Sequence, residues 1–158
     1  MTIIAFGDIH GNFQNLVTLG DIIERADVAV FLGDGESALE VLPYSVNKKL
    51  FAVCGNTDMF SRLPTEMVIE VGGKKIFIAH GHTYSVKNTL DRITRAAKEN
   101  EADIALFGHT HEWNQEERDG VTLVNVPPLG TSRTNDGNSY VKIQIVGGLV
   151  KIERCMLK

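Results

Sequence analysis

The sequence of 158 residues predicts an α/β fold with mixed β-sheet, and two patterns carry this prediction. In the first half, short apolar runs rich in Val, Ile and Phe alternate with segments of helical periodicity, as in parallel strands joined by helical crossovers. In the second half, glycine-containing turns separate further apolar runs, which is typical of hairpins. We therefore expect one domain, residues 1–158, with both parallel and antiparallel strand pairs.

Nine runs are expected to be strands, and several are apolar almost throughout, as strands covered on both faces would be. These runs are 2–6, 28–32, 50–54, 67–71, 75–79, 103–107, 121–126, 140–146 and 149–153. Tight-turn signals lie at Gly72-Gly73, Asp119-Gly120 and Gly147-Gly148.

Three segments are expected to be helical. Residues 12–25 place Phe13, Leu16, Val17, Ile22 and Ile23 along one side. Residues 85–100 place Val86, Leu90, Ile93 and Ala97 at helical spacing. Residues 37–46 would form a shorter helix that is interrupted near Pro43, because proline breaks helical hydrogen bonding.

The composition is that of a globular protein, with 43% hydrophobic and 23% charged residues. No apolar stretch approaches the ~20 residues of a membrane span, and no signal peptide is evident, so the cytoplasm is the expected location. Cys54 and Cys155 are expected to be reduced thiols. The net charge of −4 argues against a nucleic-acid-binding surface and leaves small phosphorylated substrates and homo-oligomers open.

Polar side chains follow five of the expected strands, at the edge where open α/β sheets bind ligands. After these strands come, in order, Asp8 and His10; Asp34; Asn56 and Asp58; His80 and His82; and His109 and His111. All five histidines of the chain lie in these segments. Imidazole, carboxylate and carboxamide ligands without thiolate suit Mn, Fe, Co, Ni or Zn. Leaving Asp58 and His82 aside, seven of these residues are candidate metal ligands. Seven ligands are too many for one ion with an open position, and they fit two ions that share a carboxylate.

The motifs Asp8-x-His10, Gly33-Asp34, Gly55-Asn56-x-Asp58, His80-Gly81-His82 and Gly108-His109-x-His111 together resemble those of the calcineurin-like metallophosphoesterases. Their order and spacing are most similar to the small stand-alone prokaryotic phosphodiesterase branch. The resemblance implies two mixed β-sheets packed face to face with helices on the outside, a four-layer sandwich. It also implies a dinuclear site on one edge, with Mn²⁺ as the first expectation and Fe, Ni, Co, Zn or Mg as alternatives.

The resemblance also implies a role for each motif residue. The ligands of the first ion would be Asp8, His10, Asp34 and His111, and those of the second Asp34, Asn56, His80 and His109, with Asp34 bridging. His82 would lie near the phosphate rather than on a metal. The candidates for direct catalytic roles are Asn56, His82 and Asp58.

Two departures from the family pattern concern the substrate side of the site. Many members have histidine where this chain has Thr57, and threonine cannot act as a general acid near neutral pH. A residue other than histidine is usual in the small branch, so the departure indicates the subgroup. The family often has Asn-Pro-Gly-Ser followed by arginine, whereas this chain reads Asn125-Val126-Pro127-Pro128 and then Arg133. We expect that segment to line the far wall of the site.

The resulting hypothesis is a metal-dependent phosphodiesterase that hydrolyses small phosphodiesters. Two ions about 3.5–4 Å apart would clamp the phosphoryl group, and a hydroxide bridging them would attack phosphorus. Two alternatives stay open: a non-catalytic scaffold or interaction module on the same fold, and a phosphomonoesterase. Trp113 follows the last motif and could stack on a substrate base, but packing is the favoured interpretation.

Overall fold

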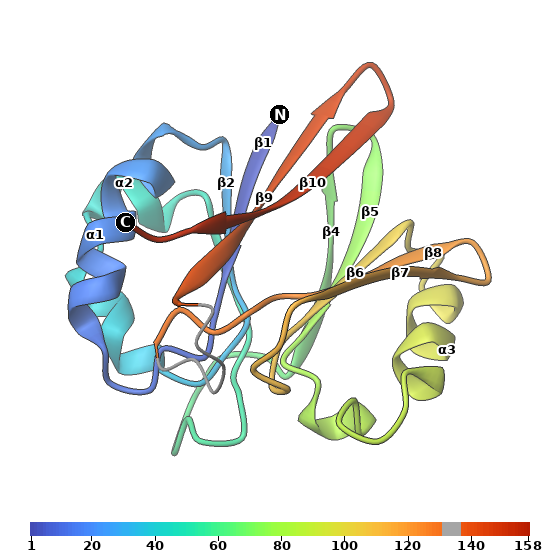
Figure 1. The fold of residues 1–158 in the computed structure, drawn as a ribbon, viewed down its shortest axis with the longest axis horizontal. Coiled ribbons are helices and arrows are strands. Elements are labelled where there is room, and N and C mark those ends of the chain that lie inside the picture. The colour runs from blue at the N-terminus through green and yellow to red at the C-terminus, as the bar shows by residue number, and fades with distance from the viewer. Residues whose placement is uncertain (131–136) are drawn as a thin grey trace.

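The computed structural model describes residues 1–130 and 137–158, which form two five-stranded mixed sheets (Figure 1). The first sheet has the order β10 (Leu149–Met156), β9 (Ser139–Val146), β1 (Thr2–Phe6), β2 (Val28–Phe31) and β3 (Leu50–Ala52). The second has the order β4 (Glu66–Val71), β5 (Lys74–Ala79), β6 (Ile104–Phe107), β8 (Val121–Asn125) and β7 (Asn114–Arg118).

Helices cover the outer face of each sheet. The first sheet carries α1 (Phe13–Arg25), the 3-10 helix η1 (Glu36–Val41) and α2 (Tyr44–Asn47) on one side of the molecule, and the second carries α3 (Asp91–Glu99) on the other (Figure 1). A further 3-10 turn, η2 (His82–Tyr84), follows β5. The predicted four-layer arrangement of two mixed sheets with outer helices is thus confirmed.

Three apolar cores hold the layers together, because each sheet is buried on both faces. The core between the sheets contains Ile3 and Val30 from the first sheet and Ile76 and Leu106 from the second. A second core lies between the first sheet and α1, and a third lies between the second sheet and α3. Trp113 packs against the core between the sheets, which agrees with the favoured packing interpretation.

The strand pairings follow the two sequence patterns. The pairs β1–β2 and β2–β3 are parallel, as the helical crossovers of the first half predict. The hairpins β4–β5, β7–β8 and β9–β10 are antiparallel, and each turns at one of the predicted glycine sites. In the second sheet β5–β6 and β6–β8 are parallel. Each sheet therefore has a set of parallel strands whose carboxyl ends lie at one edge.

Two expectations about helices need correction. The helix expected over residues 85–100 begins only at Asp91, because Ser85 adopts the left-handed conformation, with φ 52°, and ends the turn η2. On α1, Phe13 and Val17 are half exposed, whereas Leu16 and Ile23 are buried as predicted and Leu19 joins them on the buried side. Val17 lies about 100° around the helix from Leu16, which carries it away from the core.

The strand β7 is absent from the predicted set, since its sequence NQEER contains no apolar residue. It pairs only with β8, at the edge of the second sheet, so its side chains need not be apolar. Its residues are exposed or half-buried, and the predicted Asp119-Gly120 turn joins it to β8. Among the described residues, no helix has the length and apolar character needed to cross a membrane.

Candidate metal centre

Side chains from the carboxyl ends of five strands converge where the two sheets meet. Asp8 and His10 follow β1, Asp34 follows β2, and Asn56 follows β3. His80 follows β5, whereas His109 and His111 follow β6. Two groups result, Asp8–His10–His111 and Asp34–His80–His109, and within each group the potential ligand atoms lie within 4.8 Å of one another.

The two groups are joined by their carboxylates. Oδ2 of Asp34 lies 3.3 Å from Nε2 of His80 in its own group and 3.7 Å from Nε2 of His10 in the other. Oδ1 of Asp8 lies 3.6 Å from Nε2 of His10 and 3.9 Å from Nε2 of His80. Both carboxylates therefore face imidazoles of both groups, and the two groups form one site.

The remaining ring contacts complete the cluster. Nε2 of His10 lies 3.1 Å from Nε2 of His111, and Nε2 of His80 lies 3.2 Å from Nδ1 of His109. Oδ1 of Asn56 lies 3.1 Å from Nε2 of His80, so the amide belongs to the second group. All seven candidate ligands thus lie in one place.

The backbone of the site is strained. Five of the seven candidate ligands have positive φ, namely Asp8 (47°), His10 (45°), Asp34 (60°), His109 (72°) and His111 (62°). Residues other than glycine rarely adopt this conformation, at a cost on the order of 1–3 kcal/mol each. Such strain clusters at functional sites because the surrounding fold must hold side chains in place for a purpose other than stability.

Glycines allow the loops that carry candidate ligands to approach closely. A Cβ atom on Gly33, whose φ is 94°, would lie 2.5 Å from the backbone nitrogen of Gly55. A Cβ atom on Gly55 would lie 2.0 Å from Oδ1 of Asp34. Both distances are shorter than any real contact, so the loops after β2 and β3 meet only because both positions are glycine.

The carboxylates of the site are held in the ionised state. Burial alone would raise the pKa of Asp34, but the interactions with His80 and the Thr57 N–H outweigh it and lower the pKa to about 2. Burial opposes ionisation of Asp8 in the same way, and its interactions with His10 and His111 nevertheless place its pKa below the ordinary value. Both side chains are therefore negative at neutral pH.

Three histidines of the two groups, His10, His80 and His109, have shifted pKa values. The interaction with Asp8 raises the pKa of His10, and the interaction with Asp34 raises that of His80 against the effect of its burial. Burial and the neighbouring His80 lower the pKa of His109 to about 4. His109 is therefore neutral at pH 7, as a metal ligand must be, whereas His10 and His80 attract protons when no cation is bound.

The donor set fits divalent cations. Oδ1 of Asp8 is buried and accepts no hydrogen bond of ordinary geometry within the described residues, although imidazole nitrogens surround it. A shared cation would satisfy this oxygen together with the nitrogens. The donors are nitrogen and oxygen atoms without thiolate, which suits Mn, Fe, Co, Ni or Zn.

Asp58, one of the candidates for catalysis, binds backbone rather than open space. Its Oδ2 accepts the N–H groups of Asp34 and Gly55, both at 2.8 Å. Its Oδ1 accepts those of Gly35 and Glu36 at 2.9 and 3.0 Å. The carboxylate thereby fastens the loop that carries Asp34 to the loop that carries Asn56.

His82 lies beside the second group and outside both groups. Its ring centre is 5.3 Å from that of His80 and 6.1 Å from that of His109. Burial, followed by the neighbouring His80, lowers the pKa of His82. Its Nδ1 is buried without a hydrogen-bond partner among the described residues.

The segment after β8 borders the site, as expected for its far wall. The Leu129 N–H donates to the Gly7 carbonyl at 2.9 Å, and the Gly130 N–H donates to the Asp8 carbonyl at 3.0 Å. Arg133 lies outside the described residues.

Two groups at the site were not indicated by the motifs. The Leu32 carbonyl accepts the ring Nδ1–H of His80 at 2.7 Å, which leaves Nε2 free to face a cation. Lys87 brings positive charge near His109 and helps to lower its pKa. The position of the Leu32 carbonyl depends on the fold, so the sequence could not show it. Lys87 lies soon after the His80-Gly81-His82 motif, and that spacing is a signal that the sequence does contain.

The fold and site define a phosphoesterase family. The chain belongs to the calcineurin-like phosphoesterase superfamily, whose domain matches residues 1–148. Membership implies divalent metal ions, and the two groups of side chains are the candidates to hold them.

Individual relatives give the same result. A probable metallophosphoesterase of Bacillus subtilis, YsnB, is 31% identical over 146 residues, which cover 89% of this chain and 82% of the relative. The phosphodiesterase MJ0936 of Methanocaldococcus jannaschii is 28% identical over 142 residues, covering 79% and 82%. The solved structure of a single mutant of Vps29 from Entamoeba histolytica superposes with a TM-score of 0.76 over 98% of both chains, at 22% identity, and shares the fold.

Proposed function

We propose that the protein hydrolyses small phosphodiesters at a site that holds two divalent cations, with Mn²⁺ as the first candidate. The observation that carries the proposal is the position of Asp34, whose Oδ2 faces His80 and His10 at once. A carboxylate shared between two groups of ligands supports a dinuclear site rather than two independent ones. The probable metallophosphoesterase and the phosphodiesterase among the relatives support the reaction class.

Two cations, when bound, would neutralise the charge of the phosphoryl oxygens and lower the pKa of water. The first would be held by Asp8, His10, Asp34 and His111, and the second by Asp34, Asn56, His80 and His109. The protein's own contribution is to fix these ligands before the cations arrive. The positive φ values and the bonds from Asp58 serve this purpose.

His82 is the residue that we assign to the substrate phosphate. Its lowered pKa keeps the ring neutral at pH 7, so one ring nitrogen carries a proton and can donate a hydrogen bond to a phosphoryl oxygen. A neutral imidazole is a weak proton donor to a leaving alkoxide, and Thr57 offers no better acid. The leaving group would therefore take its proton from solvent.

Asp58 we assign to positioning. Both of its oxygens are engaged by backbone N–H groups, and these bonds hold Asp34 and Asn56 in register. Its effect on the reaction would be exerted through those two ligands.

A scaffold without activity is the second candidate, because a relative named for protein sorting rather than for hydrolysis, the vacuolar protein sorting-associated protein 29 of Schizosaccharomyces pombe, is 30% identical over 146 residues. The filled ligand positions favour catalysis: all seven side chains are nitrogen or oxygen donors, and they converge. A phosphomonoesterase is the third candidate, since the metal chemistry is the same for both esters.

One comparison separates the three candidates. The protein is stripped of metal with a chelator, reloaded with Mn²⁺, and assayed with bis(4-nitrophenyl) phosphate and 4-nitrophenyl phosphate under the same conditions. We expect turnover of the diester that depends on Mn²⁺ and exceeds that of the monoester. Faster turnover of the monoester would identify a phosphomonoesterase, and two bound ions without turnover of either ester would identify a scaffold.

A further inference from the structure

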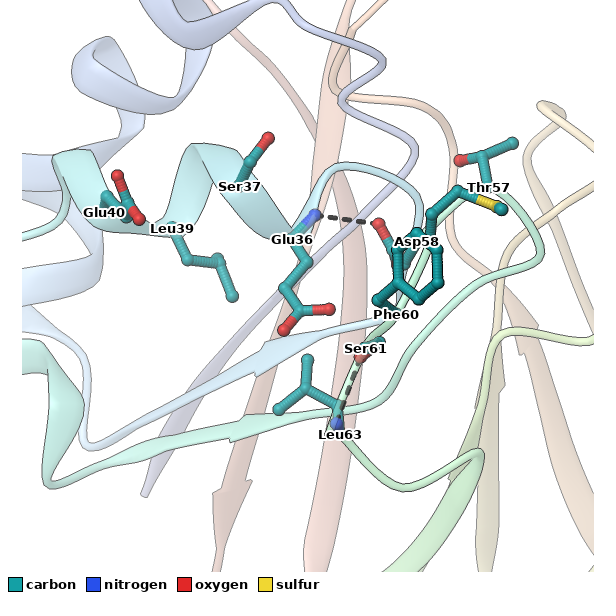
Figure 2. A pocket seen from close by; sticks show the side chains of 10 residues that line it. Glu36, Ser37, Leu39, Glu40, Thr57, Asp58, Phe60, Ser61 and Leu63 are labelled. Atoms are coloured by element: carbon teal, nitrogen blue, oxygen red, sulfur yellow. Dashed lines mark hydrogen bonds between the residues drawn. The ribbon is translucent and has the colours of Figure 1, made fainter.

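A cavity of 520 Å³ lies between η1, which follows Asp34, and the loop of residues 57–63, which follows Asn56. Figure 2 shows the side chains that line it. Thr57 belongs both to the metal centre and to the cavity: its backbone N–H donates to Oδ1 of Asp34 at 2.9 Å, and it also lines the cavity. Asp58 fastens the two walls to each other, because its carboxylate binds the backbone of Asp34 and of Glu36. The cavity therefore borders the two loops that carry Asp34 and Asn56.

The lining of the cavity combines negative charge with apolar surface. Glu36 and Glu40 contribute carboxylates, and Leu39, Leu63 and Phe60 contribute apolar surface. Of the described residues that line the cavity, none carries a positive charge. The cavity is consequently negative, whereas a site loaded with two divalent cations is positive and attracts phosphate.

Phe60 is presented to solvent. Its side chain is 98% exposed, and its backbone has φ 57°, a conformation that bulky residues avoid. Met59 beside it is 74% exposed. An uncovered aromatic face next to carboxylates is the arrangement that binds organic ammonium ions, through the negative face of the ring and through charge.

We infer that this cavity is the subsite for a cationic ester arm, so that the preferred substrates are zwitterionic phosphodiesters of amino alcohols. The phosphate would lie at the metal centre and the ammonium group between Glu36, Glu40 and Phe60. The inference rests on the proposed diesterase function and adds the class of alcohol to it. A nucleoside arm would use the ring of Phe60 by stacking but would gain less from the two carboxylates.

The kinetic test uses three diesters that share a nitrophenolate leaving group: 4-nitrophenyl phosphocholine, bis(4-nitrophenyl) phosphate and thymidine 5′-(4-nitrophenyl phosphate). For the Mn²⁺-loaded wild type and for the variant Glu36→Gln/Glu40→Gln, kcat/KM is measured on each. We expect kcat/KM for the choline ester to fall at least fivefold more than that for the bis ester. The control Glu70→Gln/Glu117→Gln removes the same charge from exposed strand positions and should leave that ratio unaltered. Equal losses on the choline and bis esters in the cavity variant would overturn the inference, as would a larger loss on the thymidine ester.

The binding test is independent of turnover. Saturation-transfer NMR with tetramethylammonium on the metal-free protein should give a signal for the wild type and for the Glu70→Gln/Glu117→Gln control. The signal should be lost in Phe60→Leu, which keeps an apolar side chain without a ring at an exposed position and should not disturb folding. Binding without diester turnover would defeat the proposed function and keep the subsite, whereas diester turnover without binding would defeat the subsite alone.

Discussion

Oδ2 of Asp34 lies 3.3 Å from Nε2 of His80, and the same oxygen lies 3.7 Å from Nε2 of His10 in the other ligand group. The second oxygen of Asp34 accepts the Thr57 N–H at 2.9 Å, so the carboxylate cannot rotate freely. One side chain thus couples both halves of the site and the loop that leads to the neighbouring cavity.

Replacing Asp34 with asparagine should disable both halves together. The amide lacks the negative charge that two cations would share, so we expect fewer than two bound ions. Diester turnover should fall more than about 100-fold, the upper end of the effect of losing an outer-shell partner. Metal content per chain and turnover are measured on one preparation. Asp21→Asn, an exposed position on α1, is the matched control. Full metal content with retained turnover would refute the bridging assignment.

Asp58→Asn tests whether this carboxylate positions the ligands or transfers a proton. Asparagine places an amide N–H₂ opposite backbone donors, and hydrogen bonds to a charged group are worth about 1.5–3 kcal/mol each. For positioning, we expect Mn²⁺ affinity to fall about 10–100-fold, activity to recover with excess Mn²⁺, and the pH profile of kcat to keep its shape. A lost limb of that profile, without recovery by metal, would show proton transfer instead.

Asp103→Asn is the matched control for that experiment. Asp103 also accepts a backbone N–H through its carboxylate, from Lys75 at 2.9 Å, but it lies just before β6, at the opposite end of that strand from His109 and His111. Its substitution should affect unfolding and leave the affinity for Mn²⁺ unaltered.

The stability of the metal-free protein should have a maximum near pH 6.5. The pKa of His109 is about 4 in the folded state, so between about 4 and 6.5 the unfolded state binds more protons and stability rises with pH. The pKa values of His10 and His80 are raised above 6.5, so above that pH the folded state binds more protons and stability falls. Urea unfolding midpoints measured from pH 5 to 8 test this expectation.

Cations should move that maximum. Mn²⁺ requires neutral imidazoles, so binding expels the protons of His10 and His80 and adds stability that grows with pH. The unfolding midpoint in excess Mn²⁺ should therefore still rise between pH 6.5 and 8. A midpoint that falls over this range with and without Mn²⁺ would contradict the assignment of these two histidines as ligands.

Strand ends, and the side chains that converge after them, could be predicted from the sequence because both depend on local pattern. The sequence itself shows the apolar run before Asp8 and the glycine beside Asp34. All five histidines follow expected strands, which indicates one shared site. The two mixed sheets were predicted from the family resemblance of these motifs, and the comparisons confirm the family.

Features that depend on tertiary contacts could not be read in this way. The strand β7 has only polar residues and exists through its pairing with β8. The Leu32 carbonyl orients His80 because β2 and β5 lie in facing sheets. The two residues are 48 positions apart in the chain, so no local pattern shows the contact. The motif places Asp58 at the site, but only the fold reveals that its oxygens bind four backbone N–H groups.

Gly55→Ala tests the close approach of the two ligand loops. The added Cβ would lie 2.0 Å from Oδ1 and 2.6 Å from the backbone nitrogen of Asp34, so the loop must move. We expect a loss of roughly 1–3 kcal/mol in unfolding free energy, as in overpacked cores, and weaker Mn²⁺ binding. Gly20→Ala is the opposing control, since a Cβ on this helical glycine meets nothing within 4 Å and should stabilise α1 by about 0.5–1 kcal/mol. Unaltered stability and metal binding in Gly55→Ala would disprove the steric argument.

His82→Ala should separate catalysis from metal binding. The ring lies beside the second ligand group but outside it, so both ions should stay bound while kcat for diesters falls. Loss of one hydrogen bond to a charged oxygen, about 1.5–3 kcal/mol, corresponds to a decrease of roughly 10- to 150-fold.

His82→Gln keeps an N–H donor and should recover part of the rate. Because burial and His80 lower the pKa of His82, the ring is neutral throughout the range from pH 7 to 9, and the variants should keep the wild-type pH profile there. Loss of one metal ion from His82→Ala would instead make this histidine a ligand, and a rate equal to that of the wild type would remove it from the reaction.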